Sequence, residues 1–300
     1  MFRFPRIGPT LVFLSAWLLP WRPAFRVRPK GSKLSFYAHW RDPIARHVSK
    51  YGSYESALTR WIGQRLAGRP PGIFIDVGAN LGWHAVHAAQ HSSVQTVVAF
   101  EPDAFNAWLL DRNLALNNLD NVLVCNQAVG AKSGWARLHR YKMSNLGRHS
   151  VITDHGCGSR IVPMTDLDGA LESLGLAERR VLVLKIDVEG YEPAVIAGAR
   201  RTLMRTDVVV LEHSPELSRV GGLATDEMID LLAGAGFVPH DVVGSGDVAE
   251  IKVDGLRRLK GQADIIWIRS DAGTAYLAQS APLQAYSVTD RQLPLPAGQG

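Results

Sequence analysis

Cysteine is almost absent from this 300-residue chain, which contains only Cys125 and Cys157. The two residues lie 32 positions apart, with no Cys-x-x-Cys pair and no histidine at metal-ligand spacing. The sequence therefore predicts neither a disulfide framework nor a zinc site, and we interpret both cysteines as reduced thiols.

Long hydrophobic runs are also lacking. The run at residues 11–19 is too short to span a bilayer, and proline and tryptophan follow it instead of a small-residue cleavage site. These features argue against a membrane span and against secretion. Because aromatic and basic residues surround the run, contact with a membrane surface stays open. We expect a cytoplasmic protein, and the leader is the segment through which a peripheral membrane contact could form.

Charge is distributed unevenly along the chain. Residues 1–70 hold 13 Lys and Arg but only two acidic residues, whereas the remaining chain has a net charge of −6. A basic segment can attract nucleic acid, anionic lipid or an anionic substrate, and charge alone does not choose among them. We expect residues 1–35, which contain five prolines, to be a loosely attached leader and residues 36–70 to form helices. A catalytic domain would then span 71–270, and 271–300 would be a disordered tail.

From residue 71 onward, short apolar runs alternate with amphipathic segments, which is typical of βαβ units and a parallel sheet. Strands are predicted at 73–77, 96–100, 122–126, 181–186 and 208–211, and helices at 82–90, 104–117 and 192–203. Residues 237–243 and 263–268 fit antiparallel closing strands. The polar, glycine-rich segment 131–163 interrupts the alternation and indicates a hairpin-like insertion. The prediction is a Rossmann-like α/β fold with a mostly parallel seven-stranded sheet and helices on both faces.

A glycine-rich turn follows the first predicted strand in the pattern Asp76-x-Gly78-x-x-x-Gly82. Glycine allows a tight turn and close backbone approach to a ligand, and the amino terminus of the next helix offers unpaired N–H groups. Asp76 can hold an ammonium group or orient the turn. The pattern favours a nucleotide-like cofactor that carries an amino acid.

An acidic residue, Glu101, ends the second predicted strand 23 residues after Gly78, and Pro102 follows it. At this position a carboxylate can accept hydrogen bonds from both ribose hydroxyls, while Pro102 turns the chain under an adenine. An NAD-binding site fits these two elements almost as well. However, the pyrophosphate-binding pattern Gly-x-Gly-x-x-Gly is absent, which argues against NAD.

A third group of charged residues lies at the end of the strand predicted at 181–186. Lys185 and Asp187 are two positions apart and therefore share one face, at the mouth of the sheet where open α/β folds bind ligands. Because charges in an apolar strand are costly unless paired, we expect Lys185 to pair with Asp187 or Glu189.

Taken in order, these motifs resemble the FkbM family of methyltransferases over about residues 50–270. The resemblance rests on Tyr54-Glu55, the 76–82 turn, Phe100-Glu101-Pro102, Asn113 with Asn117, Leu167-Asp168, the 185–190 segment, Ala197-Gly198-Ala199 and Glu212. It implies S-adenosylmethionine as cofactor and O-methylation of a natural product or sugar. It also implies that Gly78, Ala79, Asn80 and Gly82 hold the methionine end, Glu101 the ribose, and Gln127 or Ala128 the adenine edge.

Methyl transfer to oxygen requires alignment of the acceptor and removal of a proton. The candidate bases are Asp187, Glu189 and His213, with His84 less favoured, and Lys185 is their charged neighbour. Asp187 with Glu189 could instead hold a divalent cation, but no third ligand is apparent, so we predict no metal.

Other functions remain to be weighed against a small-molecule or glycan O-methyltransferase. A nucleic-acid methyltransferase is disfavoured because Ile-Asp-Val-Glu-Gly stands where an Asn-Pro-Pro-Tyr-like motif would clamp a flipped base. An NAD-dependent oxidoreductase and a non-catalytic adaptor are the alternatives. We expect the insertion to supply the acceptor wall, because aromatic and amide groups suit sugar or polyketide hydroxyls; its candidate residues are Trp135, Tyr141, Asn145 and Arg148.

Overall fold

The computed structural model describes residues 24–39, 42–141, 146–243 and 247–270. The hydrophobic run at 11–19, Asn145 and the expected tail after residue 270 lie outside these ranges. Within them, no helix combines the length and the apolar character needed to cross a membrane.

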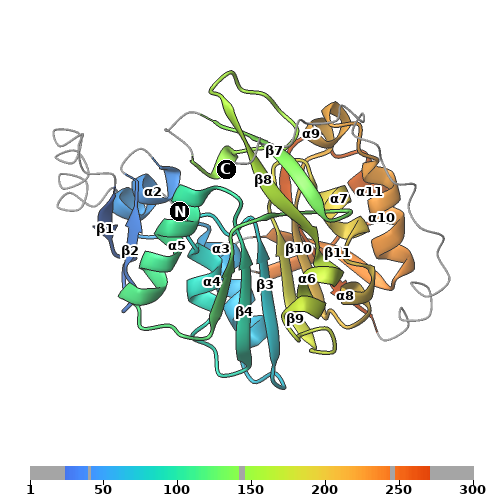
Figure 1. Ribbon diagram of the computed structural model, residues 1–300. Coiled ribbons are helices and arrows are strands. Elements are labelled where there is room, and N and C mark those ends of the chain that lie inside the picture. The colour runs from blue at the N-terminus through green and yellow to red at the C-terminus, as the bar shows by residue number, and fades with distance from the viewer. Residues whose placement is uncertain (1–23, 40–41, 142–145, 244–246, 271–300) are drawn as a thin grey trace.

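The centre of the molecule is an eight-stranded sheet in the order β12-β11-β13-β10-β9-β3-β4-β5 (Figure 1). Its strands are β3 (Gly72–Val77), β4 (Val94–Phe100), β5 (Val122–Cys125), β9 (Val181–Ile186), β10 (Val208–His213), β11 (Phe237–Val243), β12 (Asp247–Glu250) and β13 (Ala263–Arg269). The strands from β10 to β5 are parallel to their neighbours, and β13, β11 and β12 pair antiparallel. The predicted class is confirmed, but the count of seven was one strand short because β12 extends β11 as a hairpin.

Helices cover both faces of this sheet. One hydrophobic cluster packs the sheet against α2 (Pro43–Tyr51), α3 (Ser56–Leu66), α4 (Trp83–Ala88) and α5 (Ala104–Leu116). The other face packs against α6 (Leu167–Ser173), α7 (Glu192–Ala197), α8 (Arg200–Met204), α10 (Thr225–Gly234) and α11 (Val253–Arg257). The short helix α9 (Pro215–Val220) follows β10. This two-sided burial explains why β3 and β9 are apolar along almost their whole length.

Residues 24–35 are more firmly attached than the loose leader that we expected. β1 (Phe25–Val27) pairs with β2 (Phe36–Ala38), and Val27 and Leu34 join the core beneath α5. Two side chains on α5 form hydrogen bonds with the backbone of this segment, as a neighbouring strand would. The Asn113 side-chain amide accepts from the N–H of Tyr37 and donates to its carbonyl oxygen. The Asn117 side-chain amide makes the same two hydrogen bonds with Ser35. The expectation failed because these contacts join segments about 80 residues apart.

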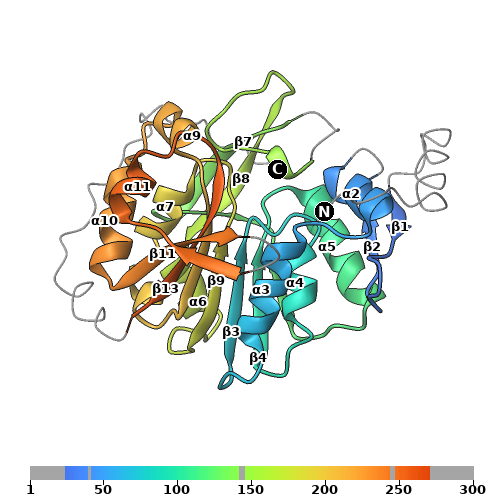
Figure 2. The ribbon, with the colours of Figure 1, turned by 180° about the vertical axis from the view of Figure 1, so that it is seen from behind.

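The insertion forms a separate three-stranded sheet in the order β6-β8-β7. It consists of β6 (Ala128–Gly130), β7 (Gly134–His139), the short 3₁₀-helix η1 (Leu146–Arg148) and β8 (Ser159–Asp166). Both views show β7 and β8 standing above the end of the main sheet (Figures 1 and 2). The insertion is therefore placed to cover whatever lies at that end.

Two helix boundaries differ from the prediction. The helix expected over 192–203 is split into α7 and α8 around Gly198, where a Cβ atom would lie 2.1 Å from the Gly130 carbonyl oxygen of β6. Within the segment 36–70, which we expected to be helical, α2 ends at Tyr51 and α3 begins only after Glu55, whose backbone is left-handed with φ of 38°. As shown below, this conformation accompanies a contact between the Glu55 side chain and α4.

Candidate active site

The ends of four neighbouring strands bring charged side chains together on one face of the sheet. Asp76 on β3 pairs in register with Lys185 on β9, and Glu212 on β10 pairs with Asp264 on β13. On the same face, two positions away along each strand, lie Phe74, Val183, Val210 and Ile266, which all pack into the cluster under α3 and α4. The apolar core therefore ends in a polar layer at the mouth of the sheet.

The glycine turn after β3 is pressed against the end of β9. Gly78 has φ of 82°, and a Cβ atom at this position would lie 1.9 Å from the Asp187 carbonyl oxygen. The backbone N–H groups of Gly78 and Ala79 both donate to the Phe100 carbonyl at 2.9 Å. The turn therefore holds together the ends of β3, β4 and β9, and only glycine fits at its first position.

Glu101 is held in place by the chain around it. Its carboxylate accepts hydrogen bonds from the backbone N–H of Asn80 and of Asp103, each at 2.8 Å, and only 5% of the residue is exposed. Burial raises the Glu101 pKa to about 8, because desolvation disfavours the charged form. A side-chain hydrogen bond from Asn106 also reaches this carboxylate, which can still accept from a further donor because it has about four lone-pair sites.

A first cavity, the cofactor pocket, lies between the glycine turn and the insertion. Seven of the predicted cofactor-binding residues line it: Gly78, Asn80, Glu101, Pro102, Gln127, Ala128 and Asp187. The insertion contributes Leu138, Gly147, His149 and Val151. Three predicted residues do not line the pocket: Ala79 is buried within the turn, Gly82 begins α4, and Asp76 lies beneath the turn beside Lys185.

A second cavity adjoins the first and shares Gly78, Asn80, Gly147 and Asp187 with it. We name it the acceptor cavity after the role that we propose for it. Its volume is about 310 Å³. Its remaining lining is strongly acidic and comes from distant parts of the chain: Asp42, Pro43, Ile44, Tyr54, Glu55, Arg148, Glu189, Glu212 and Gln262. A molecule in this cavity would therefore lie beside a molecule in the cofactor pocket.

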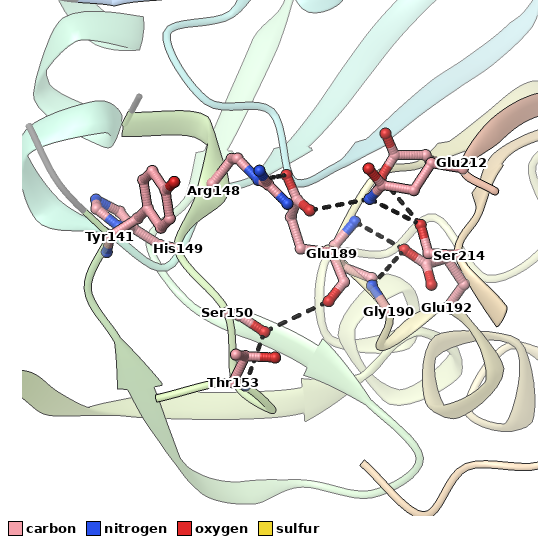
Figure 3. A network of polar contacts seen from close by, with 12 residues as sticks. Tyr141, Arg148, His149, Ser150, Thr153, Glu189, Gly190, Glu192, Glu212 and Ser214 are labelled. Carbon is pink, nitrogen blue, oxygen red and sulfur yellow. Dashed lines mark hydrogen bonds and ion pairs between the residues drawn. The ribbon is translucent and has the colours of Figure 1, made fainter. Parts of the chain in front are cut away.

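The carboxylates of the acceptor cavity are organised by a few donors. The Lys185 ammonium is 3.0 Å from Asp187 Oδ2 and 4.0 Å from Asp76 Oδ1, so the expected pairing with Asp187 is confirmed. The Gln262 amide donates to both Glu189 and Glu212 at 3.3 Å. Arg148 Nε lies 3.5 Å from Glu189 Oε1, and Figure 3 shows its side chain directed toward Glu189.

The pKa values in this cavity reflect crowding of negative charge. Burial raises the Glu212 pKa to about 9, with further contributions from the charges of Asp187 and Glu189. Burial followed by the charge of Asp187 also raises the Glu189 pKa, and Arg148 opposes this shift. Glu212 is therefore protonated at neutral pH, when it can donate as well as accept a hydrogen bond.

The pair formed by Glu55 and His84 was not predicted. His84 Nε2 lies 2.7 Å from Glu55 Oε2. Burial alone would raise the Glu55 pKa, but the hydrogen bond with His84 and the charges of His84 and Lys185 lower it to about 2. The only sequence signals were the Tyr54-Glu55 dipeptide and the position of His84 after the glycine turn.

Three of the four non-glycine residues with left-handed backbone in the described ranges line the acceptor cavity. They are Glu55, Asn80 and Glu189, with φ between 38° and 52°. Such conformations cost free energy and cluster at functional sites, where the surrounding structure enforces them. This clustering marks the acceptor cavity independently of its charges.

Some predicted residues lie elsewhere. His213 shares the opposite sheet face with Val209 and Leu211, is 1% exposed and lines neither cavity, so its proposed role as a base is wrong. Trp135 is 52% exposed, and neither it nor Tyr141 lines the acceptor cavity. Of the expected acceptor wall, Arg148 is the described residue that reaches the cavity, and its guanidinium lies 5.3 Å from the centre of the Tyr141 ring. Among the described residues, no group of three or more His, Cys, Asp or Glu is arranged to hold a metal ion.

The comparisons with known proteins agree with this arrangement. The model of the methyltransferase FkbM domain matches residues 76–239, which is more than half of the chain. The hexuronic acid methyltransferase AglP of Haloferax volcanii is 28% identical over 142 residues, which cover 47% of this chain and 55% of that relative. The chain thus matches about half the length of this relative.

The matches to solved structures have low sequence identity and TM-scores below 0.5. An S-adenosylmethionine-dependent methyltransferase from Agrobacterium tumefaciens is 11% identical with a TM-score of 0.43, and the match covers 83% of this chain and 71% of that one. TYW2 of M. jannaschii, in complex with S-adenosylmethionine, is 13% identical with a TM-score of 0.37, and the match covers 83% and 88%.

S-adenosylmethionine fits the chemistry of the cofactor pocket. Glu101 has lone pairs for ribose hydroxyls, the turn at Gly78 brings backbone close to the pocket, and Asp187 and Glu189 offer negative charge near a sulfonium or ammonium group. Together with the match of the family model over residues 76–239, this places the chain in the FkbM family of methyltransferases, which use S-adenosylmethionine.

Proposed function

We propose that this protein is an O-methyltransferase whose acceptor is a hydroxyl group of a glycan or another polyhydroxylated small molecule. The observation that carries the proposal is the contact between two cavities at Gly78, Asn80 and Asp187. One cavity has the features expected of a cofactor site, and the other is lined by groups that accept hydrogen bonds.

In this proposal the cofactor contacts follow the motif. Gly78, Ala79, Asn80 and Gly82 shape the methionine end, while Glu101 accepts from the ribose hydroxyls. Pro102, Gln127 and Ala128 surround the adenine, and Asp76 acts indirectly through Lys185. When bound, the cofactor supplies an electrophilic methyl group on sulfur, so the protein mainly has to orient the acceptor and receive its proton.

The acceptor class follows from the lining of the second cavity. Asp187, Glu189 and Glu212 can each accept hydrogen bonds from hydroxyl groups, and Gln262 fixes two of them. Among the described residues that line the cavity, Arg148 is the one that is basic, and it is already close to Glu189. An uncharged polyol is therefore favoured over an anionic acceptor. The sugar named for the relative AglP supports a glycan, although the relative's name specifies a hexuronic acid.

The proton of the acceptor hydroxyl would pass to a carboxylate in this cavity. Asp187 is the leading candidate, because it lines both cavities and therefore lies where methyl group and acceptor meet. The Lys185 ammonium forms an ion pair with Asp187 Oδ2 at 3.0 Å, which fixes the position of this carboxylate. Glu189 is the second candidate, and its left-handed backbone keeps it at the cavity wall.

Isothermal titration calorimetry of S-adenosylhomocysteine into the purified full chain tests the cofactor site without an acceptor. We expect micromolar binding that weakens at least tenfold in Glu101→Ala, because two hydrogen bonds to a charged group are lost. Lys132→Ala, an exposed substitution outside both cavities, is the control. A folded wild-type sample that does not bind would return the NAD and adaptor alternatives to consideration.

The acceptor is tested by a second experiment, which measures release of S-adenosylhomocysteine over a panel of neutral sugars, hexuronic acids, phenols and amines. We expect the highest turnover with neutral polyols. In Asp187→Asn, turnover at saturating cofactor should fall by a larger factor than cofactor affinity does, because Asp187 lines both cavities. With a ¹³C-labelled methyl donor, carbon NMR of the product should show a methyl ether. A methyl group on nitrogen or carbon would contradict the proposal.

A further inference from the structure

His149 is a buried polar residue of the insertion that no step of the proposed reaction uses. It follows η1 directly and lines the cofactor pocket together with Leu138 and Val151. Only 5% of its side chain is exposed. Its neighbour Arg148 points instead toward Glu189 in the acceptor cavity, while His149 lies on the side of Tyr141 (Figure 3).

The surroundings of His149 fix its tautomer. The backbone N–H of Tyr141 donates to Nδ1 at 3.0 Å, so Nδ1 carries a lone pair. Burial lowers the His149 pKa, although the charge of Asp103 opposes the shift, and the ring is therefore neutral at physiological pH. A neutral imidazole whose Nδ1 accepts must carry its proton on Nε2, which makes Nε2 a hydrogen-bond donor.

This donor has no hydrogen-bond partner among the described residues. The carboxylate oxygen Oδ2 of Asp103 lies 3.9 Å away, beyond hydrogen-bonding distance, and the other Asp103 oxygen caps α5 by accepting from Phe105 and Asn106. Buried donors are rarely left unpaired, because burial removes the water that would otherwise satisfy them. An unpaired donor at the wall of a ligand pocket indicates a partner on the ligand.

We propose that His149 is a cofactor-binding residue whose Nε2–H donates to an acceptor atom of the adenosine part of S-adenosylmethionine. The inference rests on the proposed position of the cofactor, since His149 shares its pocket with Glu101, Pro102, Gln127 and Ala128. It does not line the acceptor cavity. The adenosine part offers ring nitrogens and ribose oxygens as acceptors, and the donor of His149 suits either kind of atom.

Calorimetry with S-adenosylhomocysteine tests the inference on the full chain. His149→Phe keeps a planar ring of similar size but removes the donor, and we expect it to weaken binding about tenfold. His149→Gln retains an N–H donor and should recover part of the loss. His155→Phe is the matched control, because His155 belongs to the same insertion, contacts the other side of Tyr141 and lines neither cavity. Urea unfolding of each variant verifies that it is folded.

Analogues of S-adenosylhomocysteine then separate a direct contact from an indirect effect. The 1-deaza, 3-deaza, 7-deaza, 2′-deoxy and 3′-deoxy forms each lack one acceptor atom. If the contact exists, one analogue loses affinity for the wild type but not for His149→Phe. Equal binding of S-adenosylhomocysteine by wild type and His149→Phe would overturn the inference. It would also be overturned if, for every analogue, the loss of affinity caused by the missing atom added to the loss caused by His149→Phe. A wild type that does not bind at all would instead remove the cofactor site itself, along with this inference.

Discussion

Individual residues at the mouth of the sheet combine burial with charge, and Glu101 shows the consequence most directly. In the free protein its pKa is about 8, because burial outweighs the two backbone N–H groups that stabilise the carboxylate. Ribose hydroxyls would donate to the ionised form. Binding should therefore favour the carboxylate and lower this pKa.

This linkage predicts proton release on cofactor binding. Between pH 6 and pH 8 the affinity for S-adenosylhomocysteine should rise with pH, and part of a proton should be released per molecule bound. Calorimetry at pH 7 in buffers of different ionisation enthalpy measures the release. Glu101→Gln should release less than the wild type, and an equal release from both proteins would assign the titration to another group.

A second prediction at this scale concerns Gly78. Gly78→Ala should destabilise the fold by about 2 kcal/mol or more, because the positive φ is strained for alanine and its Cβ would clash with the Asp187 carbonyl. Gly175→Ala is the control, since Gly175 has φ of 69° but open space around its Cβ position. Urea unfolding should show a loss of only about 1 kcal/mol for the control. Equal losses would mean that the close approach of β9 contributes nothing.

At the scale of single elements, the first turn of α3 is tied to α4 through the pair formed by Glu55 and His84. Glu55 lines the cavity that we assign to the acceptor, has a left-handed backbone, and contacts His84 of α4. Glu55, the N-cap of α3, makes no side-chain capping hydrogen bond and contacts His84 of α4 instead. This suggests that the contact contributes more to the site than the cap would contribute to the stability of α3.

A double-mutant cycle with Glu55→Gln and His84→Gln should therefore give a coupling of roughly 1–3 kcal/mol at neutral pH. The folded-state pKa of Glu55, about 2, lies below its ordinary value of 4.5. Its stabilising contribution is therefore present above about pH 4.5 and is lost as the pH falls toward 2. Urea unfolding between pH 6 and pH 3.5 should show the difference between wild type and Glu55→Gln shrinking. A constant difference would argue against a charged Glu55.

The elements that the sequence predicts best are those with a local pattern. The strands expected at 181–186 and 237–243 have these bounds in the structure. The first is an almost continuous apolar run, and the second is flanked in the sequence by Gly236 and Gly244. The split between α7 and α8 could not be predicted, since it depends on the approach of β6 to Gly198. The glycine turn and Glu101 were recognisable because they lie in a local sequence motif. Glu55, Gln262 and His149 could not be assigned to the site, because only the tertiary fold brings them there.

For the molecule as a whole, the insertion contacts both cavities, as the glycine turn and the end of β9 also do. Gly147 lines both of them, Arg148 lines the acceptor cavity and His149 lines the cofactor pocket. Three consecutive residues thus connect two adjacent sites. A ligand that moves these residues at one site would therefore change the shape of the other site. By thermodynamic reciprocity, whatever affinity the cofactor adds for the acceptor, the acceptor adds for the cofactor.

This connection has a consequence for steady-state kinetics. If the cofactor fixes residues 147–149, it completes the wall against which the acceptor binds, and turnover should follow a compulsory order with the cofactor entering first. A dead-end analogue of the acceptor would then inhibit uncompetitively against S-adenosylmethionine, whereas random entry would make the same inhibition noncompetitive. The short 3₁₀-helix between two cavities would thus set the sequence in which the two substrates arrive.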